Sequence, residues 1–152
     1  MTKYKKVRDE YFNELLGKYS RIDNSFCNKK QYTETDLTVG DGYPTYFSFR
    51  FDATRNGQDV VPPYISVEFG TYNTKFYEIL EENKNSIEDE FGRECKLDWR
   101  RNYGEYKFHV IQFLKPYEDN LNLRDEAEWN KLIEFHCKYM PKLKAVVLKY
   151  LD

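Results

Sequence analysis

Two short segments of the chain alternate apolar and polar residues with a period of two, and this pattern constrains the fold most. The segments are residues 45–51 and 64–70. Their apolar faces are formed by Phe47, Phe49 and Phe51 in the first and by Ile65, Val67 and Phe69 in the second. Period-two alternation is typical of half-buried strands. The sequence therefore predicts two β-strands that are neighbours along the chain.

Three longer segments show helical periodicity instead. Apolar residues recur at three- and four-residue steps in residues 2–19, 73–91 and 123–150, which predicts three amphipathic helices. Gly92 directly follows the second segment, where a glycine commonly ends a helix. Pro141 lies inside the third segment, and we expect a kink or break there because proline removes a helical hydrogen bond.

A second hairpin is expected from residues 95–101 and 106–113, which flank the turn 102–105. We expect Trp99 to lie opposite Phe108 on the apolar face of this hairpin. The other face would then carry Lys96, Asp98, Arg100, Lys107 and His109, with Arg100 opposite Lys107.

The expected element order is α-β-β-α-β-β-α, with the polar segment 20–42 forming a surface loop that has room for a short extra element. Strands that come in adjacent hairpins pair antiparallel, and helices then cover one face of the sheet. The fold class is therefore predicted to be α+β, with a mostly antiparallel four-stranded sheet and the helices packed on one face. The length of 152 residues suits a single domain, residues 1–152.

Aromatic side chains are expected to fill much of the core, because the chain has 14 Tyr and 11 Phe. Trp99 and Trp129 lie on the apolar sides of their elements, so we expect both to be core anchors. His136 lies on the apolar stripe of the last helix and is expected to be a hydrogen-bonded core residue.

Charge and cysteine content narrow the class of protein. The net charge is −2, from 24 basic and 26 acidic residues, which argues against a dedicated polyanion binder. The three cysteines are far apart and form no Cys-x-x-Cys pair, as is usual for a reduced intracellular chain. Neither a signal peptide nor a membrane-spanning segment is expected, so the predicted location is the cytoplasm.

The C-terminal part of the chain, from Ile65 onward, resembles a known family. The residues that carry this resemblance are Ile65-Ser-Val-Glu68, Ile87-Glu-Asp-Glu-Phe-Gly92, Leu97-Asp-Trp99 and Asp125-Glu-Ala-Glu-Trp129. They are similar to the packing signature of the bacterial domain-of-unknown-function 4268 family. The resemblance implies an accessory module of prokaryotic or phage origin, in a setting associated with defence against foreign DNA. It implies no catalytic residues.

Two sets of residues match catalytic sites only in part. Glu94-Cys95-Lys96, with Asp89 upstream, matches part of a metal-dependent nuclease site, in which carboxylates hold Mg²⁺ and a lysine stabilises developing charge. Cys137 with His109 and an acid could form a nucleophilic set. The spacing requires neither arrangement, and we expect no catalytic residues, no metal and no cofactor.

The outer face of the sheet is the expected ligand surface. The candidate binding residues are Lys96, Arg100, Lys107, His109, Tyr46, Arg50 and Tyr64. The leading hypothesis is a non-catalytic binding module with a protein partner. The alternative is a nucleic-acid-binding domain, because a face that mixes aromatics and cations can stack bases and neutralise phosphates. A metal-dependent nuclease is the second alternative.

Overall fold

A computed structural model describes most of the chain: residues 3–23, 29–32, 37–40, 46–51, 60–61, 63–105, 107–114, 121–122 and 125–151. The strands are β1 (Lys29–Tyr32), β2 (Leu37–Gly40), β3 (Tyr46–Phe51), β4 (Val60–Val61), β5 (Pro63–Phe69), β6 (Asp98–Tyr103), β7 (Phe108–Leu114) and β8 (Leu121–Asn122). The helices are α1 (Lys3–Tyr19), α2 (Thr74–Glu82), α3 (Lys84–Phe91) and α4 (Trp129–Leu151), with short 3₁₀ turns η1 (Thr71–Asn73) and η3 (Glu126–Glu128).

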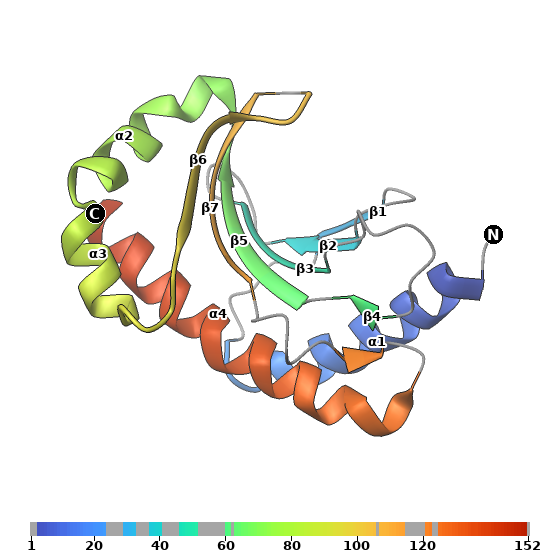
Figure 1. The fold of residues 1–152 in the computed structure, drawn as a ribbon. Helices are drawn as coiled ribbons and strands as arrows, with labels where there is room; N and C mark the ends of the chain where they lie inside the picture. Colours follow the sequence, from blue (N-terminus) through green and yellow to red (C-terminus); the bar gives the residue numbers. More distant parts are fainter. Residues whose placement is uncertain are drawn as a thin grey trace.

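The main sheet has six strands in the order β1-β2-β3-β5-β7-β6, and every pair of neighbours is antiparallel. The short strands β4 and β8 form a separate antiparallel pair. The main sheet is curved, and the four helices lie along its convex side (Figure 1). The core lies between this side and the helices, with Phe49, Ile65 and Ile111 among its fully buried residues.

The predicted α+β class is confirmed, but the prediction of four strands is wrong. The four predicted strands correspond to β3, β5, β6 and β7, which lie together in the sheet. The additional strands β1 and β2 fall within residues 20–42, which were predicted to be a loop. The β1 sequence, KKQY, has no period-two apolar pattern, and in β2, LTVG, only Leu37 and Val39 alternate with other residues, which is too short a run to predict a strand.

The predicted helix 73–91 is two helices, because the chain leaves the helical conformation at Asn83. The Asn83 side chain donates to the carbonyl of Ile79 at 2.8 Å, which satisfies one carbonyl at the end of α2. The break leaves Leu80 and Ile87 both fully buried. Gly92 ends α3 as predicted, with φ of 113°.

The last helix, α4, continues through Pro141, so the expected break is absent from the described helix. Met140 and Leu143, on either side of the proline, are fully buried. Their burial stabilises the helix across the hydrogen bond that proline cannot make. No helix in the described part of the chain combines the length and the apolar character needed to span a membrane.

The α1 region is joined to α4 by buried polar contacts. Tyr11 and His136 are fully buried and hydrogen-bond at 2.8 Å between the Tyr11 hydroxyl and Nδ1, so the expectation for His136 is confirmed. Lys144 Nζ lies 2.6 Å from Asp23 Oδ2, just beyond the end of α1. Trp129 is buried, packed edge-on against Tyr11 at 5.6 Å between ring centroids.

The β6–β7 hairpin is confirmed, but its predicted register is wrong. Trp99 lies opposite Ile111, and Arg100 lies opposite Val110 rather than Lys107. Between Arg100 and Tyr103 the register shifts, because β6 contains an extra residue there. Trp99 was predicted to lie opposite Phe108, so the observed register is displaced by three residues along β7, and an odd displacement exchanges the faces of a strand. The side chains of β7 therefore point opposite to the prediction.

Candidate functional site: the concave face of the sheet

A line of polar residues crosses the concave face of the sheet. Ser66 of β5 pairs in register with Gln112 of β7, and Gln112 pairs with Asp98 of β6. Directly opposed residues of an antiparallel sheet project from the same face. These three side chains therefore form one line, which we call the polar row. The backbone register extends the line to the position of Ser48 in β3.

Asp98 is the acceptor at the β6 end of the polar row. Its Oδ2 atom accepts a hydrogen bond from Gln112 Nε2 at 3.2 Å and another from Arg100 Nε at 2.8 Å. Gln112 is buried, so it holds Asp98 from the protein side. Asp98 and Arg100 are the accessible members, with 41% and 40% of their side chains exposed. Within the described residues, the terminal nitrogens of Arg100 have no hydrogen-bond partner.

Ser66 lies at the other end of the described polar row. It is fully buried, and among the described residues its hydroxyl has no hydrogen-bond partner. Buried hydroxyls are almost always paired, and an unpaired one costs about 1–3 kcal/mol. Because of this cost, a packing role alone does not explain a serine at this position of the polar row.

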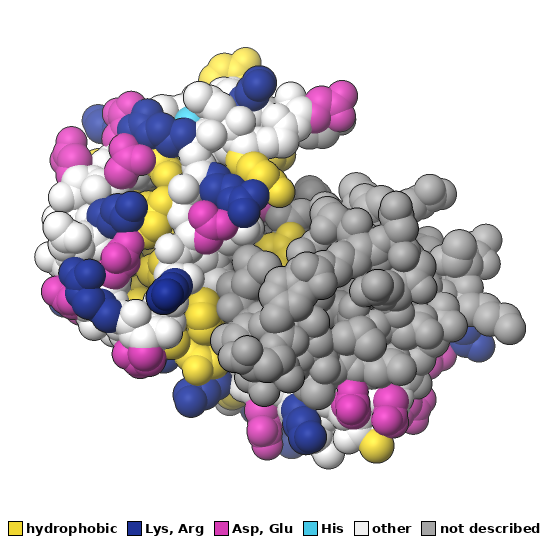
Figure 2. Space-filling model, in the orientation of Figure 1, with side chains coloured by type: hydrophobic (Ala, Val, Ile, Leu, Met, Phe, Trp, Pro, Cys, Tyr) yellow, Lys and Arg dark blue, Asp and Glu magenta, His cyan; other side chains and the backbone are white. Residues whose placement is uncertain are grey.

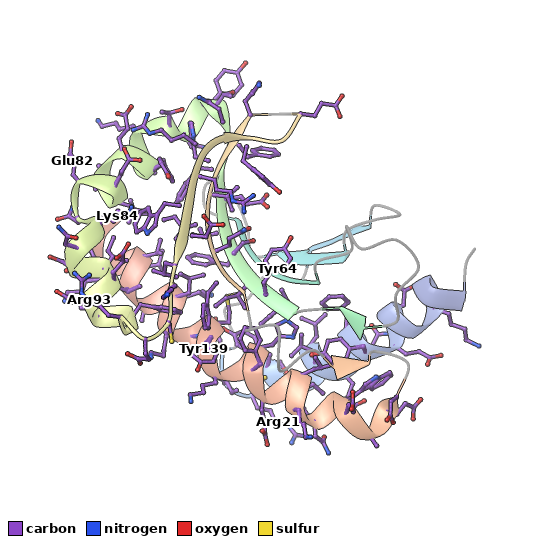
Figure 3. All side chains as sticks on the ribbon, in the orientation of Figure 1. Arg21, Tyr64, Glu82, Lys84, Arg93 and Tyr139 are labelled. Atoms are coloured by element: carbon purple, nitrogen blue, oxygen red, sulfur yellow. The ribbon has the colours of Figure 1, made fainter. Side chains whose placement is uncertain are left out.

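Aromatic side chains border the polar row. The Arg100 guanidinium lies over the Tyr103 ring, 4.7 Å from its centroid, and Tyr103 is 46% exposed. Tyr64 projects from β5 on the same concave side (Figure 3). A cation stacked on an exposed ring offers both a flat apolar surface and unsatisfied N–H donors.

Cations near β6 are paired with carboxylates. Arg101 makes a bidentate contact with Glu81 of α2, with Nη2 2.7 Å from Oε1 and Nε 3.1 Å from Oε2. This pairing lowers the pKa of Glu81. Arg93, after α3, pairs with Asp89 through a single contact, from Nε to Oδ1. Lys, Arg, Asp and Glu side chains are mixed across the described part of this surface (Figure 2), so it lacks the positive excess that polyanion binding requires.

His109 was predicted to lie on the outer face, and this prediction is wrong. His109 has the same phase in β7 as Ile111 and pairs with the core residue Phe69 of β5, so it lies on the helical side, where it is buried and stacks on Tyr77 of α2 at 5.0 Å between centroids. Its Nε2 atom lies 3.0 Å from Thr74 Oγ1, and its Nδ1 atom accepts from the Asn102 backbone N–H at 3.3 Å. Burial lowers the pKa of His109, with a further contribution from Arg101.

The other predicted binding residues do not form one cluster. Lys96 is exposed in the loop before β6, and Lys107 is exposed in the hairpin turn with φ of 56°. Tyr46 and Arg50 pair in backbone register with Glu68 and Tyr64, which gives them concave-face positions; their side chains lie outside the described part of the structure. Arg100 and Tyr64 are thus the predicted residues whose described side chains lie on the concave face.

The nuclease candidate is not assembled as such a site requires. Glu94 and Lys96 lie in the loop between α3 and β6 rather than on adjacent strands. Asp89 is bound to Arg93. In the described residues no group of three or more His, Cys, Asp or Glu side chains is close enough together to hold a metal ion.

Cys137 and His109 are likewise placed on different elements. Cys137 is on α4, and burial raises the pKa of its thiol, which opposes formation of the nucleophilic thiolate. His109 lies on β7 with both ring nitrogens occupied by Thr74 and Asn102. His109 is therefore not placed to act as the base that would activate Cys137.

The sequence did not predict that Ser66, Gln112 and Asp98 would form one row. A signal for Gln112 was present, since it has the same phase in β7 as Phe108 and Val110. A polar residue in that phase indicates that the opposite phase, with Ile111 and Phe113, faces the core. The link to Asp98 depends on the bulge and could not be read from alternation.

Together, the curved antiparallel sheet, its helix-covered convex side and its polar row define an α+β domain with a structured polar surface on one sheet face. The chain belongs to the family described as Domain of unknown function (DUF4268), whose model matches residues 7–151. This match extends the resemblance to essentially the whole chain. No curated protein and no solved structure matches the chain.

Proposed function

We propose that the chain is a non-catalytic binding module that docks a protein partner on the concave face of the sheet. The observation that carries this proposal is the Asp98–Arg100 pair, oriented by the buried Gln112 at the exposed end of the polar row. A buried residue that holds a partly exposed pair in place reduces the entropy lost when a ligand binds.

A polypeptide suits the chemistry of this face. The Asp98 carboxylate and the Arg100 guanidinium balance each other, so the pair has no net charge. It presents acceptors and donors side by side, which match the N–H and C=O groups of a peptide. Tyr103 and Tyr64 supply the aromatic surface typical of protein interfaces.

The setting is part of the same proposal. We propose a cytoplasmic accessory module of prokaryotic or phage origin, associated with defence against foreign DNA. The support for this setting is the family resemblance and the reduced cysteines, of which Cys95 and Cys137 are free in the described residues.

Binding to single-stranded nucleic acid is the second candidate. The stacked Arg100–Tyr103 pair favours it, because such a pair can accept an unpaired base. The mixed charge of the surrounding surface opposes it.

A double variant tests the proposal. Asp98→Ala with Arg100→Ala removes the exposed pair and should leave the fold intact, because an exposed ion pair contributes less than about 1 kcal/mol. The control is Lys131→Ala with Glu134→Ala, which removes one cation and one carboxylate from the exposed surface of α4. Immobilised proteins are incubated with extract of the native host, and retained proteins are quantified by mass spectrometry.

The proposal expects one protein to be retained by the wild type and the control and lost from the Asp98/Arg100 variant. Retention by all three folded proteins would contradict it. In a parallel arm, a labelled mixed-sequence oligonucleotide is titrated at increasing KCl concentration. Salt-sensitive binding that is lost in the Asp98/Arg100 variant would replace the protein partner with a nucleic acid.

A further inference from the structure

His109 occupies a closed position between β7 and α2, where both ring nitrogens have partners. The Thr74 hydroxyl donates to the carbonyl of Thr71 at 2.9 Å, so toward His109 it acts as an acceptor. Nε2 of His109 must therefore carry the proton. Nδ1 accepts from the backbone N–H of Asn102, so it must be unprotonated. The geometry thus fixes His109 as the neutral Nε2–H tautomer.

The Asn102 N–H belongs to the bulge of β6. Asn102 has φ of 51°, and the register of the hairpin shifts between Arg100 and Tyr103. The extra residue in a bulge has no partner in the strand ladder, and here its N–H is satisfied by His109. His109 therefore holds the bulge in place from inside the sheet.

The bulge in turn determines the local arrangement of the proposed binding face. The extra residue allows Tyr103 to pair with Phe108 and so to project from the concave face, beside Arg100. The Arg100 guanidinium then lies over the Tyr103 ring. Without the bulge, alternation along β6 would turn Tyr103 to the helical side.

We propose that His109 is a positioning residue for the concave binding face, and that its protonation releases the β6 bulge and disorders the Arg100–Tyr103 stack. This inference rests on the proposed function and adds a regulation to it. Protonated His109 would carry a proton on Nδ1, so it could no longer accept from Asn102. Two donors would then face each other across the contact.

The charged and titratable groups around His109 come from two elements. Arg101 of β6 opposes a positive charge on the ring, whereas Glu78 and Glu81 of α2 favour one. Burial is the largest influence, and the pKa of His109 lies below its usual value. Burial raises the pKa of the stacked Tyr77 to about 12, so it stays neutral at any pH near 7. Release of the bulge is therefore an acid response.

Nuclear magnetic resonance of the free, ¹⁵N-labelled protein tests this inference without a ligand. The His109 ring is titrated from about pH 8 to pH 5 while the amide exchange of Asn102 is followed. Exchange rates are normalised to the intrinsic rate at each pH, and the Ile111 amide in the middle of β7 is the reference. We expect the protection of Asn102 to fall about tenfold as His109 is protonated, while that of Ile111 is unchanged.

Two variants separate positioning from a general structural role. His109→Asn retains an acceptor oxygen near the position of Nδ1 but cannot be protonated, so Asn102 should stay protected across the whole pH range. His109→Phe removes the acceptor, so Asn102 should lack protection even at pH 8. Should either variant fail to fold, the wild-type titration still decides. Constant Asn102 protection through the titration of His109 would overturn the inference. Because no partner is used, this outcome is independent of whether the Asp98/Arg100 variant loses binding.

Discussion

Tyr11 and His136 meet in the core at 2.8 Å between the Tyr11 hydroxyl and Nδ1, and this hydrogen bond joins α1 to α4. The pair is fully buried, and burial raises the pKa of Tyr11. The phenol is therefore neutral and able to donate at all physiological pH values. The contact links residues 125 positions apart in the sequence, so it can form only when the two helices have packed.

Tyr11→Phe should destabilise the protein by about 1–3 kcal/mol, because it removes the hydroxyl from a buried nitrogen while keeping the ring. Urea denaturation followed by circular dichroism would measure the loss. Tyr72→Phe is the matched control, since Tyr72 is 96% exposed. Equal stability of the two variants would show that the Tyr11–His136 bond contributes nothing.

Alanine substitutions at two glycine positions should change the stability of the protein in opposite directions. Gly92→Ala should cost about 1–3 kcal/mol, because φ of 113° is strained for alanine and the new Cβ would contact the Glu94 carboxylate. Gly17→Ala should gain up to about 1 kcal/mol, since Gly17 is inside α1 and nothing lies within 4 Å of the new Cβ. Thermal unfolding of both variants checks the contrast; a stabilising Gly92→Ala would contradict the backbone argument.

The Glu81–Arg101 ion pair should stabilise the fold only above acidic pH. The pKa of Glu81 is lowered, chiefly by its hydrogen bond from Arg101, so the folded state binds a proton less readily than the unfolded chain. The stability from this pair is present at pH 7 and is lost as the pH falls through the lowered pKa.

Glu81→Gln should therefore lose less than about 1 kcal/mol at pH 7, because the pair is partly exposed, and a smaller amount at pH 3. The measurement is the free energy of unfolding in urea at both pH values. Glu82→Gln, at an exposed neighbouring position, is the control. A loss that is equal at pH 7 and pH 3 would rule out an ionic contribution.

The two tryptophans should differ in fluorescence. Trp129 is buried, whereas Trp99 is half-buried, with its indole N–H bonded to Glu88 at 3.0 Å and Lys84 over its ring at 5.6 Å. A Trp99→Phe variant should emit at short wavelength and resist quenching by iodide. A Trp129→Phe variant should be quenched more strongly. Indistinguishable quenching would contradict the difference in burial.

Catalysis should be absent. Incubation with Mg²⁺ or Mn²⁺ and single- or double-stranded DNA is expected to give no cleavage, because Glu94 and Lys96 lie in a loop and no cluster of acidic side chains forms around them among the described residues. Electrophoresis of the products checks this expectation. Cleavage that Glu94→Ala or Lys96→Ala abolishes would overturn the proposal of a non-catalytic module.

The parts of the fold that could be predicted from the sequence are those determined by local patterns, such as alternation along a strand. The alternation in β3 and β5 is strict, so Phe47, Phe49 and Ile65 were placed correctly in the core. Gly92 ended α3 for a local reason, its positive φ. The α1 helix was also predicted nearly to its observed bounds, since its apolar periodicity is unbroken.

The errors arise where distant packing decides the outcome. The helix break at Asn83 is stabilised by burial of Leu80 and Ile87, and asparagine alone does not require a break. The concave site depends on a bulge that changes the register of β6 and β7. Because alternation cannot show an extra residue, Asp98 and Gln112 could not be joined from the sequence. His109 was assigned to the wrong face although it shares the phase of Ile111 and Phe113, because Phe108 and Val110 were taken as the core-facing residues.

The bulge at Arg100–Tyr103 also affects how copies of this chain meet one another. In the described sheet β6 is a terminal strand, and an unpaired straight strand is a template on which another molecule can extend the sheet. The register shift and the inward-directed N–H of Asn102 interrupt that template in the C-terminal half of β6. A feature that shapes a binding face thereby also opposes aggregation through the β6 edge.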